Sequence, residues 1–162
     1  MRKIDMRQEL VHLGSGAHAL AIQLLGNRED AADVVHDAFA VVLARPDAYD
    51  VNKGALRPWF FRVVRNRCLD LLRRRKKFES VELVCPGVLP DTALENAQRD
   101  EQLHSALLRL KRNQREILVL RDYLDFSYAE IAAVMDIAPG TVMSRLHRAR
   151  MALKAILEPD HE

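Results

Sequence analysis

Apolar residues recur every three or four positions along several stretches of the chain, and this period predicts α-helices rather than strands. In the first half of the chain, the predicted helices span residues 16–26, 28–45 and about 58–77, with a polar loop before the last of them. Gly26 closes the first helix, and acidic residues occupy the first turn of the second, where the helix dipole favours them. Alternating β-branched runs bounded by turn pairs are nearly absent. The pattern therefore predicts an all-α fold.

A more specific helical pattern lies near the C-terminus. Ser127 followed by Glu130 is a capping box, which predicts a short helix over roughly residues 128–135. A tight turn follows, and Pro139 suits the first position of a second helix because its missing amide hydrogen is not needed there. The apolar seam of that helix consists of Val142, Leu146, Ala149, Leu153 and Ile156. Its opposite side carries Thr141, Ser144, Arg145 and Arg148.

A short helix, a tight turn and a longer helix with a polar face are typical of a helix-turn-helix with its recognition helix. Threonine and serine side chains reach phosphates or base edges, and arginine forms two hydrogen bonds to guanine. The alternative is a plain helical hairpin with a charged face. The capping box, the turn length and the polar face together favour DNA binding.

Charge divides the chain into three parts. Residues 1–77 hold 15 basic and 9 acidic side chains, residues 78–102 hold one base and six acids, and residues 103–162 hold 9 bases and 8 acids. The middle part contains two prolines and a glycine and shows no clean apolar period, so we expect a flexible acidic linker there. The chain is therefore expected to form two small helical domains on either side of it.

The long helix at residues 58–77 sorts its side chains by chemistry. At about 100° per residue, an apolar seam and a polar side each cover about 80° of its surface. The seam consists of Phe60, Val64, Cys68 and Leu71, and the polar side of Arg62, Asn66, Asp70 and Arg73. Between Arg62 and Lys77 there are eight basic residues and one acid. An ordinary solvated face mixes its signs, so this one favours nucleic acid.

Several functional classes receive no support from the sequence. Cys68 and Cys85 lie far apart in no C-x-x-C pattern, which favours unpaired thiols over a redox pair, and the six histidines are scattered. No clustered carboxylates or glycine-rich phosphate loop indicates an enzyme, and neither a cofactor nor a metal is expected. No apolar run approaches the roughly 18 to 20 residues that cross a bilayer, and no signal peptide precedes the first helix, so we expect a cytoplasmic protein.

Three stretches, taken in order, resemble a bacterial sigma factor of the extracytoplasmic-function (ECF) group. They read LLGNREDAADVVHDAF, RPWFFRVVRNRCLDLLRRRKK and, after the acidic linker, LLRLKRNQREILVLRDYLDFSYAEIAAVMDIAPGTVMSRLHRARMALK. The resemblance covers roughly residues 17–156. A linker of some 25 residues has no room for a middle sigma domain, which implies the minimal two-domain architecture of that group.

The resemblance implies that the first domain engages and opens the promoter −10 element. The residues that match this segment are Arg62, Arg65, Asn66, Asp70, Arg73 and Arg74. The loop at residues 50–54, with Asn52 and Lys53, matches the place where the family captures a flipped-out base of the non-template strand. Flipping a base costs a few kcal/mol, so a pocket with nearby positive charge is needed to hold it. Trp59 is either a core residue or a platform for base stacking.

The resemblance also implies partners. The acidic helix matches the segment that docks on the β′ clamp helices of core RNA polymerase, through Asp30, Asp33, Val34 and Asp37. The helix-turn-helix matches the module that reads the −35 element, through Arg115, Thr141, Ser144, Arg145 and Arg148. Part of that module packs on the polymerase β flap. An anti-sigma factor is a further expected partner.

Two features stay open at this point. The acidic linker either threads the positively charged channels of polymerase, as in the family, or is a solvated tether. The stretch HLGSGAH replaces the longer aromatic-containing opening helix of many family members, which leaves the start of the first helix undetermined. The alternative function is a helix-turn-helix regulator that binds promoter DNA without joining polymerase. That function would leave the first domain without a purpose.

Overall fold

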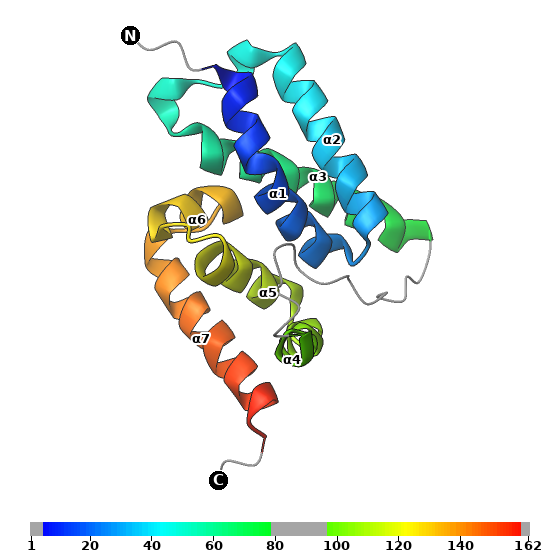
Figure 1. Cartoon of the computed structure of the whole chain (residues 1–162). Coiled ribbons are helices and arrows are strands. Elements are labelled where there is room, and N and C mark those ends of the chain that lie inside the picture. Colours follow the sequence, from blue (N-terminus) through cyan, green and yellow to red (C-terminus); the bar gives the residue numbers. More distant parts are fainter. Residues whose placement is uncertain (1–4, 79–96, 160–162) are drawn as a thin grey trace.

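The protein is described by a computed structural model that covers residues 5–78 and 97–159 (Figure 1). Within these ranges there are only helices and helical turns, without a strand, as the sequence predicts. The N-terminal domain consists of α1 (Met6–Leu25), α2 (Arg28–Ala44) and α3 (Leu56–Phe78), with the short turns η1 (Pro46–Ala48) and η2 (Val51–Lys53) between the last two. The C-terminal domain consists of α4 (Ala97–Leu108), α5 (Arg112–Leu118), the π-helical turn η4 (Val119–Tyr123), α6 (Tyr128–Met135) and α7 (Pro139–Leu157).

Helix α1 begins ten residues earlier than the sequence predicts and runs through two glycines. A Cβ at Gly14 would lie 3.3 Å from Phe39 Cζ, and one at Gly16 would lie 3.1 Å from Leu124 Cδ2. Glycine costs a helix about 1 kcal/mol relative to alanine, but at these two positions it allows close packing of neighbouring rings and aliphatic groups. Tertiary packing therefore overrides the local breaker signal.

The ends of α1 and α2 follow their sequence signals. Gly26 has a φ of 71° and donates its backbone N–H to Ile22 O over 2.8 Å, which closes α1. Asn27 then caps α2, because its side-chain oxygen accepts hydrogen bonds from the backbone N–H groups of Glu29 and Asp30. Gly26 and Asn27 are adjacent in the chain, so α2 begins directly after α1 ends, and the two helices pack against each other.

Helix α3 has the two faces that its sequence predicts. Phe60, Val64 and Cys68 are fully buried, and Leu71 is half-buried. Phe60 stacks on Phe39 of α2 with ring centroids 5.0 Å apart. The seam therefore anchors α3 in the domain core and turns its polar side outward.

The C-terminal domain contains the predicted helix-turn-helix. The Ser127 hydroxyl accepts from the Glu130 backbone N–H at 3.1 Å, and the Glu130 carboxylate accepts from the Ser127 N–H at 3.0 Å, so the capping box is formed. Asp136 ends α6 in the left-handed conformation, with a φ of 56°. Helix α4 begins at Ala97, within the segment 78–102 that is predicted to be the linker. The rest of the predicted linker lies outside the described residues.

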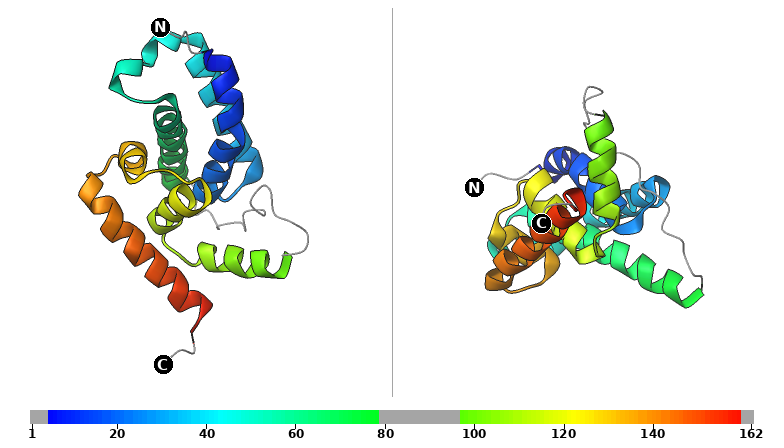
Figure 2. Two further views of the ribbon diagram at one scale, coloured as in Figure 1. Left: turned by 60° about the vertical axis from the view of Figure 1, so that its left-hand side comes forward. Right: turned by 90° about the horizontal axis from the view of Figure 1, so that it is seen from below.

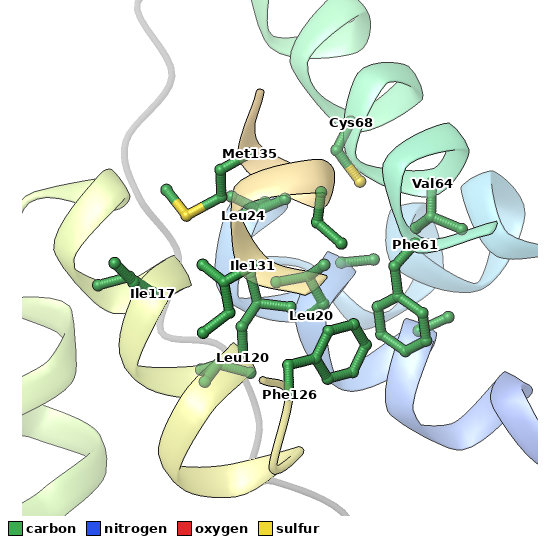
Figure 3. Close-up of a cluster of buried hydrophobic side chains, with 14 of the residues drawn as sticks. Leu20, Leu24, Phe61, Val64, Cys68, Ile117, Leu120, Phe126, Ile131 and Met135 are labelled. Carbon is green, nitrogen blue, oxygen red and sulfur yellow. The ribbon is translucent and has the colours of Figure 1, made fainter. Parts of the chain in front are cut away.

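The two domains share one hydrophobic core. Helix α6 packs on α3, and α5 packs on α1 (Figure 2). Figure 3 shows Leu20 and Phe61 from the N-terminal domain in one cluster with Leu120, Phe126 and Ile131 from the C-terminal domain. The described residues therefore form a closed arrangement in which each domain covers an apolar surface of the other.

Candidate nucleic-acid interface

The polar side of α3 lies on the surface. Arg62, Asn66, Asp70, Arg73 and Arg74 are exposed. Asp70 forms an ion pair with Arg73, one turn later, over 3.2 Å. Asp70 is the one acid on the exposed side of α3 from Arg62 to Lys76, and the remaining charged side chains there are basic. The exposed surface of α3 is therefore strongly positive.

Two of the predicted residue sets face each other across a groove of about 580 Å3 between α2 and α3. The α2 wall carries Asp30, Asp33, Val34 and Asp37, and the α3 wall carries Asn66, Arg67, Asp70, Arg74 and Arg75. Asp30 is paired with Arg75 across the groove over 2.7 Å, and both side chains are partly buried. Asp33 and Asp37 are exposed, whereas Val34 is almost completely buried. The residues predicted for polymerase docking thus lie beside those predicted for the −10 element.

A second hollow, of about 280 Å3, lies where the loop before α3 meets that helix. Its lining includes Tyr49, Lys53, Trp59 and Arg62. The Tyr49 and Trp59 rings lie 5.2 Å apart at an interplanar angle of 50°. Trp59 is only half-buried, so it belongs to the wall of this hollow as well as to the edge of the core.

Local bonds hold the loop in place. The Tyr49 hydroxyl donates to Gly54 O over 2.8 Å, and the Asp50 carboxylate accepts from the Asn52 backbone N–H at 2.9 Å. Burial, followed by the nearby charges of Glu9 and Asp50, raises the pKa of Tyr49, so the phenol stays protonated and can donate. Sequence reasoning did not single out Tyr49. An aromatic residue directly before the 50–54 loop was the only available signal.

The recognition helix presents the predicted polar face. Ser144, Arg145 and Arg148 are exposed and Thr141 is half-buried. The Ser144 hydroxyl donates to Thr141 O over 3.0 Å, a bond within the first turns of α7. All four side chains therefore lie on the outer side of the helix-turn-helix.

Arg115, which the resemblance assigns to the −35 element, is only 4% exposed in this structure. Its guanidinium donates to Leu110 O over 3.1 Å and to Leu108 O over 3.3 Å, at the C-terminal end of α4. In this structure Arg115 holds the α4–α5 connection together and does not reach the surface.

Two of the arginines predicted for the −10 element, Arg62 and Arg65, form ion pairs with carboxylates of the C-terminal domain. Arg65 donates to the carboxylate of Glu116 in α5, which is only 1% exposed. Burial raises the pKa of Glu116, and the positive charge of Arg65 opposes that rise. Arg62 Nη2 lies 3.7 Å from Asp136 Oδ1, at the end of α6.

The described ranges show neither a metal site nor a membrane span. No group of three or more histidine, cysteine, aspartate or glutamate side chains there is placed to hold a metal ion. None of the described helices is both long and apolar enough to span a membrane. Cys68 is unpaired and buried, and Cys85 lies outside the described residues.

Known families and proteins match both halves of the chain. Sigma-70 region 2 matches residues 11–78, and Sigma-70 region 4 matches residues 100–153. The ECF RNA polymerase sigma factor EcfG of Rhodopseudomonas palustris is 32% identical over 96% of this chain and 87% of its own length. SigW of Bacillus subtilis is 27% identical over 85% of this chain and 80% of its own length.

Two solved structures match nearly the whole chain. The sigma factor RpoE of Bartonella quintana, in complex with the anti-sigma factor NepR, has a TM-score of 0.80 and 29% identity over 97% of this chain and 99% of its own. CnrH, in complex with the cytosolic domain of CnrY, has a TM-score of 0.70 and 26% identity over 96% of this chain and 88% of its own. The chain therefore belongs to the extracytoplasmic-function group of sigma factors, which bind core RNA polymerase and direct transcription initiation at promoters.

Proposed function

We propose that this sigma factor divides promoter recognition between two domains. Residues 1–77 dock on polymerase and engage the −10 element, residues 103–162 read the −35 element, and the acidic segment 78–102 joins them. The observation that carries the proposal is the arrangement on α3, where the positive stripe runs past the groove shared with α2 and reaches the aromatic-walled hollow. One helix, α3, would thereby contact the DNA backbone, help hold the flipped-out base and lie beside the polymerase-docking surface of α2.

The hollow beside the 50–54 loop is the proposed site for a flipped-out base of the −10 element. Tyr49 and Trp59 supply ring surfaces, and base–aromatic stacking contributes about 1–3 kcal/mol per base. Lys53 and Arg62 supply positive charge for the adjoining phosphates. Asn52 lies exposed on the same loop. Arg65, Asn66, Asp70, Arg73 and Arg74 extend the contact along α3.

Docking on the β′ clamp helices is assigned to α2. Asp33 and Asp37 are the principal contacts, since both are exposed on its surface, while Asp30 is shared with Arg75. Val34 supports the helix from the core side. For the β flap, the proposed surface is an apolar hollow of about 170 Å3 on the C-terminal domain, lined by Leu103, Leu107, Leu118, Val119, Asp122, Tyr123 and Leu153.

The −35 element is assigned to the outer face of α7. Ser144 and Thr141 are short polar side chains at the start of the recognition helix, and Arg145 and Arg148 follow on the same side. Residues near the N-terminus of a recognition helix contact base edges in the major groove. Each good bidentate arginine–guanine contact contributes about 1–3 kcal/mol of discrimination.

An anti-sigma factor is the proposed regulator. Both matched structures hold their sigma factors in complexes, one with NepR and the other with the cytosolic domain of CnrY. A partner of this kind would act where core polymerase works, in the cytoplasm. The protein itself is proposed to act by binding, without catalysis of its own.

The proposal is tested by capture on purified core RNA polymerase, followed by transcription from genomic fragments. We expect a stable complex that starts RNA at defined sites. Asp33→Ala with Asp37→Ala should weaken capture, and Arg145→Ala with Arg148→Ala should weaken −35-dependent initiation while capture is retained. Matched controls are Glu9→Ala for the acids and Lys154→Ala for the bases, because both are exposed on other surfaces. Duplex binding without any capture on core would contradict the proposal and favour a regulator that acts alone.

A further inference from the structure

One exposed side chain of the recognition helix differs in chemistry from those assigned to the −35 element. Met143 is 62% exposed, whereas Val142 and Leu146 on the same helix are buried. Single apolar residues are common on protein surfaces, so exposure alone assigns no role. The position of Met143 is more informative, because the residue lies between Thr141 and Ser144 near the start of α7.

Helical geometry places Met143 on the outward side of α7, which lies at the edge of the molecule (Figure 1). The buried residues of this helix are Val142, Leu146 and Ala149. At about 100° per residue, Ser144 lies almost opposite that buried seam, and Met143 and Arg145 lie about 100° to either side of Ser144. Met143 therefore shares the outward surface with two of the residues proposed to contact the −35 element.

The position of Met143 along the helix axis also suits contact with bases. Residues near the N-terminus of a recognition helix reach base edges in the major groove. Helix α7 begins at Pro139, so Met143 lies about 6 Å along its axis. Met151 is a second exposed methionine of α7, at 53%, but it lies about 12 Å further along the axis. Met143 is therefore placed to reach a base, and Met151 supplies a matched control.

The charge around Met143 favours DNA over a protein partner. Helix α7, which the structure describes in full, contains no acidic residue, and its basic residues are Arg145, Arg148, Arg150 and Lys154. Such a surface attracts the phosphates of DNA. A docking site for an apolar protein segment needs a continuous apolar surface, whereas the neighbours of Met143 on the outward side are Ser144 and Arg145. Promoter DNA is therefore the occupant that fits this surface.

Methionine selects one chemical group among those that the major groove offers. Its side chain donates no hydrogen bond and its sulfur is a weak acceptor, so it gains little from a phosphate or a polar base edge. Thymine presents an apolar C5-methyl group in the major groove, and cytosine lacks that group. The unbranched, flexible thioether chain of methionine adapts readily to the shape of a methyl group. The matching partner for Met143 is therefore the thymine methyl group.

We propose that Met143 contacts the C5-methyl group of a thymine in the −35 element and thereby favours thymine over cytosine at that position. This inference rests on the proposed −35 role of α7, and it specifies the chemistry of one base that this role selects. Ser144, Arg145 and Arg148 supply the polar contacts, and Met143 adds one that depends on a single methyl group. Burial of one such group corresponds to about a fourfold change in affinity.

Replacement of thymine by uracil tests this contact, because the two bases differ only by the methyl group. The template is a promoter that the parent protein uses with core polymerase, and its −35 element is first located by base replacement. Each thymine of that element, on either strand, is then replaced singly by uracil. Initiation and capture on core are measured for the full-length parent and for Met143→Ala, Met143→Leu and Met151→Ala. Both methionines are exposed, so these variants should fold as the parent does.

We expect uracil at one position to lower initiation by the parent about fourfold, as one methyl group predicts. Met143→Leu and Met151→Ala should show the same loss, whereas Met143→Ala should initiate equally from the thymine and uracil promoters. The proposal would be overturned by a −35 element without thymine, by a parent that is insensitive to every uracil, or by an undiminished uracil effect in Met143→Ala. Loss of core capture in Met143→Ala would also overturn it, since Met143 would then contact polymerase. Failure of the parent to initiate with core, or normal −35 dependence in Arg145→Ala with Arg148→Ala, would instead contradict the proposed function.

Discussion

The guanidinium of Arg57 lies over the ring of Phe126, with its central carbon 3.8 Å from the ring centroid. These residues are far apart in the sequence and belong to different domains. The same guanidinium donates to Leu124 O, so one side chain makes both a cation–π contact and a hydrogen bond across the interface. Arg57 therefore joins the two domains, a role that no local sequence pattern predicts.

Replacement of Arg57 should measure this connection. Arg57→Met keeps much of the side-chain length but removes the charge and the donor. We expect a loss of about 1–2 kcal/mol in the free energy of unfolding, because a partly buried carbonyl loses its donor and the ring loses its cation. Urea unfolding followed by circular dichroism measures the change. Arg7→Met on the exposed surface of α1 is the control, and an equal effect of both variants would show that Arg57 contributes no specific contact.

The two ion pairs that join α5 and η4 to other helices should differ in strength. The Arg65 and Glu116 side chains are 16% and 1% exposed, whereas those of Arg150 and Asp122 are 48% and 46% exposed. Removal of one partner from a buried pair leaves an uncompensated charge, so Glu116→Gln should cost about 3 kcal/mol. Asp122→Asn should cost less than about 1 kcal/mol, since water screens the exposed pair. Thermal unfolding at matched pH compares the two, and similar losses would contradict the burial of Glu116.

The faces of individual helices could be predicted from the sequence, because burial along one helix follows a local period. Phe60, Val64 and Cys68 recur at helical spacing and are buried together. The capping box at Ser127 and Glu130 involves residues three apart, so its geometry is also a local property. The fold class and the helix-turn-helix were predictable for the same reason.

Contacts between distant elements could not be predicted in this way. Glu116 and Arg65 are 51 residues apart, and no local pattern fixes how α5 lies relative to α3. Arg115 lies among other basic residues in the sequence, so nothing local distinguishes it from a surface arginine. Its hydrogen bond to Leu110 O forms because the chain bends between α4 and α5. The early start of α1 depends on Phe39 and Leu124, which pack against its glycines. Each of these features thus depends on tertiary packing.

The buried thiol should make stability depend on pH. Burial, with a smaller contribution from the Glu116 charge, raises the pKa of Cys68 from 9.0 to about 12. The folded state favours the neutral thiol, so its stability is full below about pH 9 and falls as the pH rises toward about 12. From about pH 8 to about pH 10, Cys85→Ser protein should lose about 1.4 kcal/mol more than Cys68→Ala in the same background. Parallel pH profiles of the two proteins would show that the thiol reaches water.

Two glycines should respond to alanine in opposite directions. Gly54 has a φ of 151°, where a side chain is strained, and its carbonyl accepts the Tyr49 hydroxyl that holds the loop. Gly54→Ala should therefore cost about 1–2 kcal/mol. Gly140 lies in the first turn of α7, and a Cβ there would meet no atom within 4 Å. Gly140→Ala should stabilise the protein by about 0.5–1 kcal/mol, because alanine reduces the entropy of the unfolded chain. Urea midpoints that shift in the same direction for both would contradict the backbone geometry assigned to the loop.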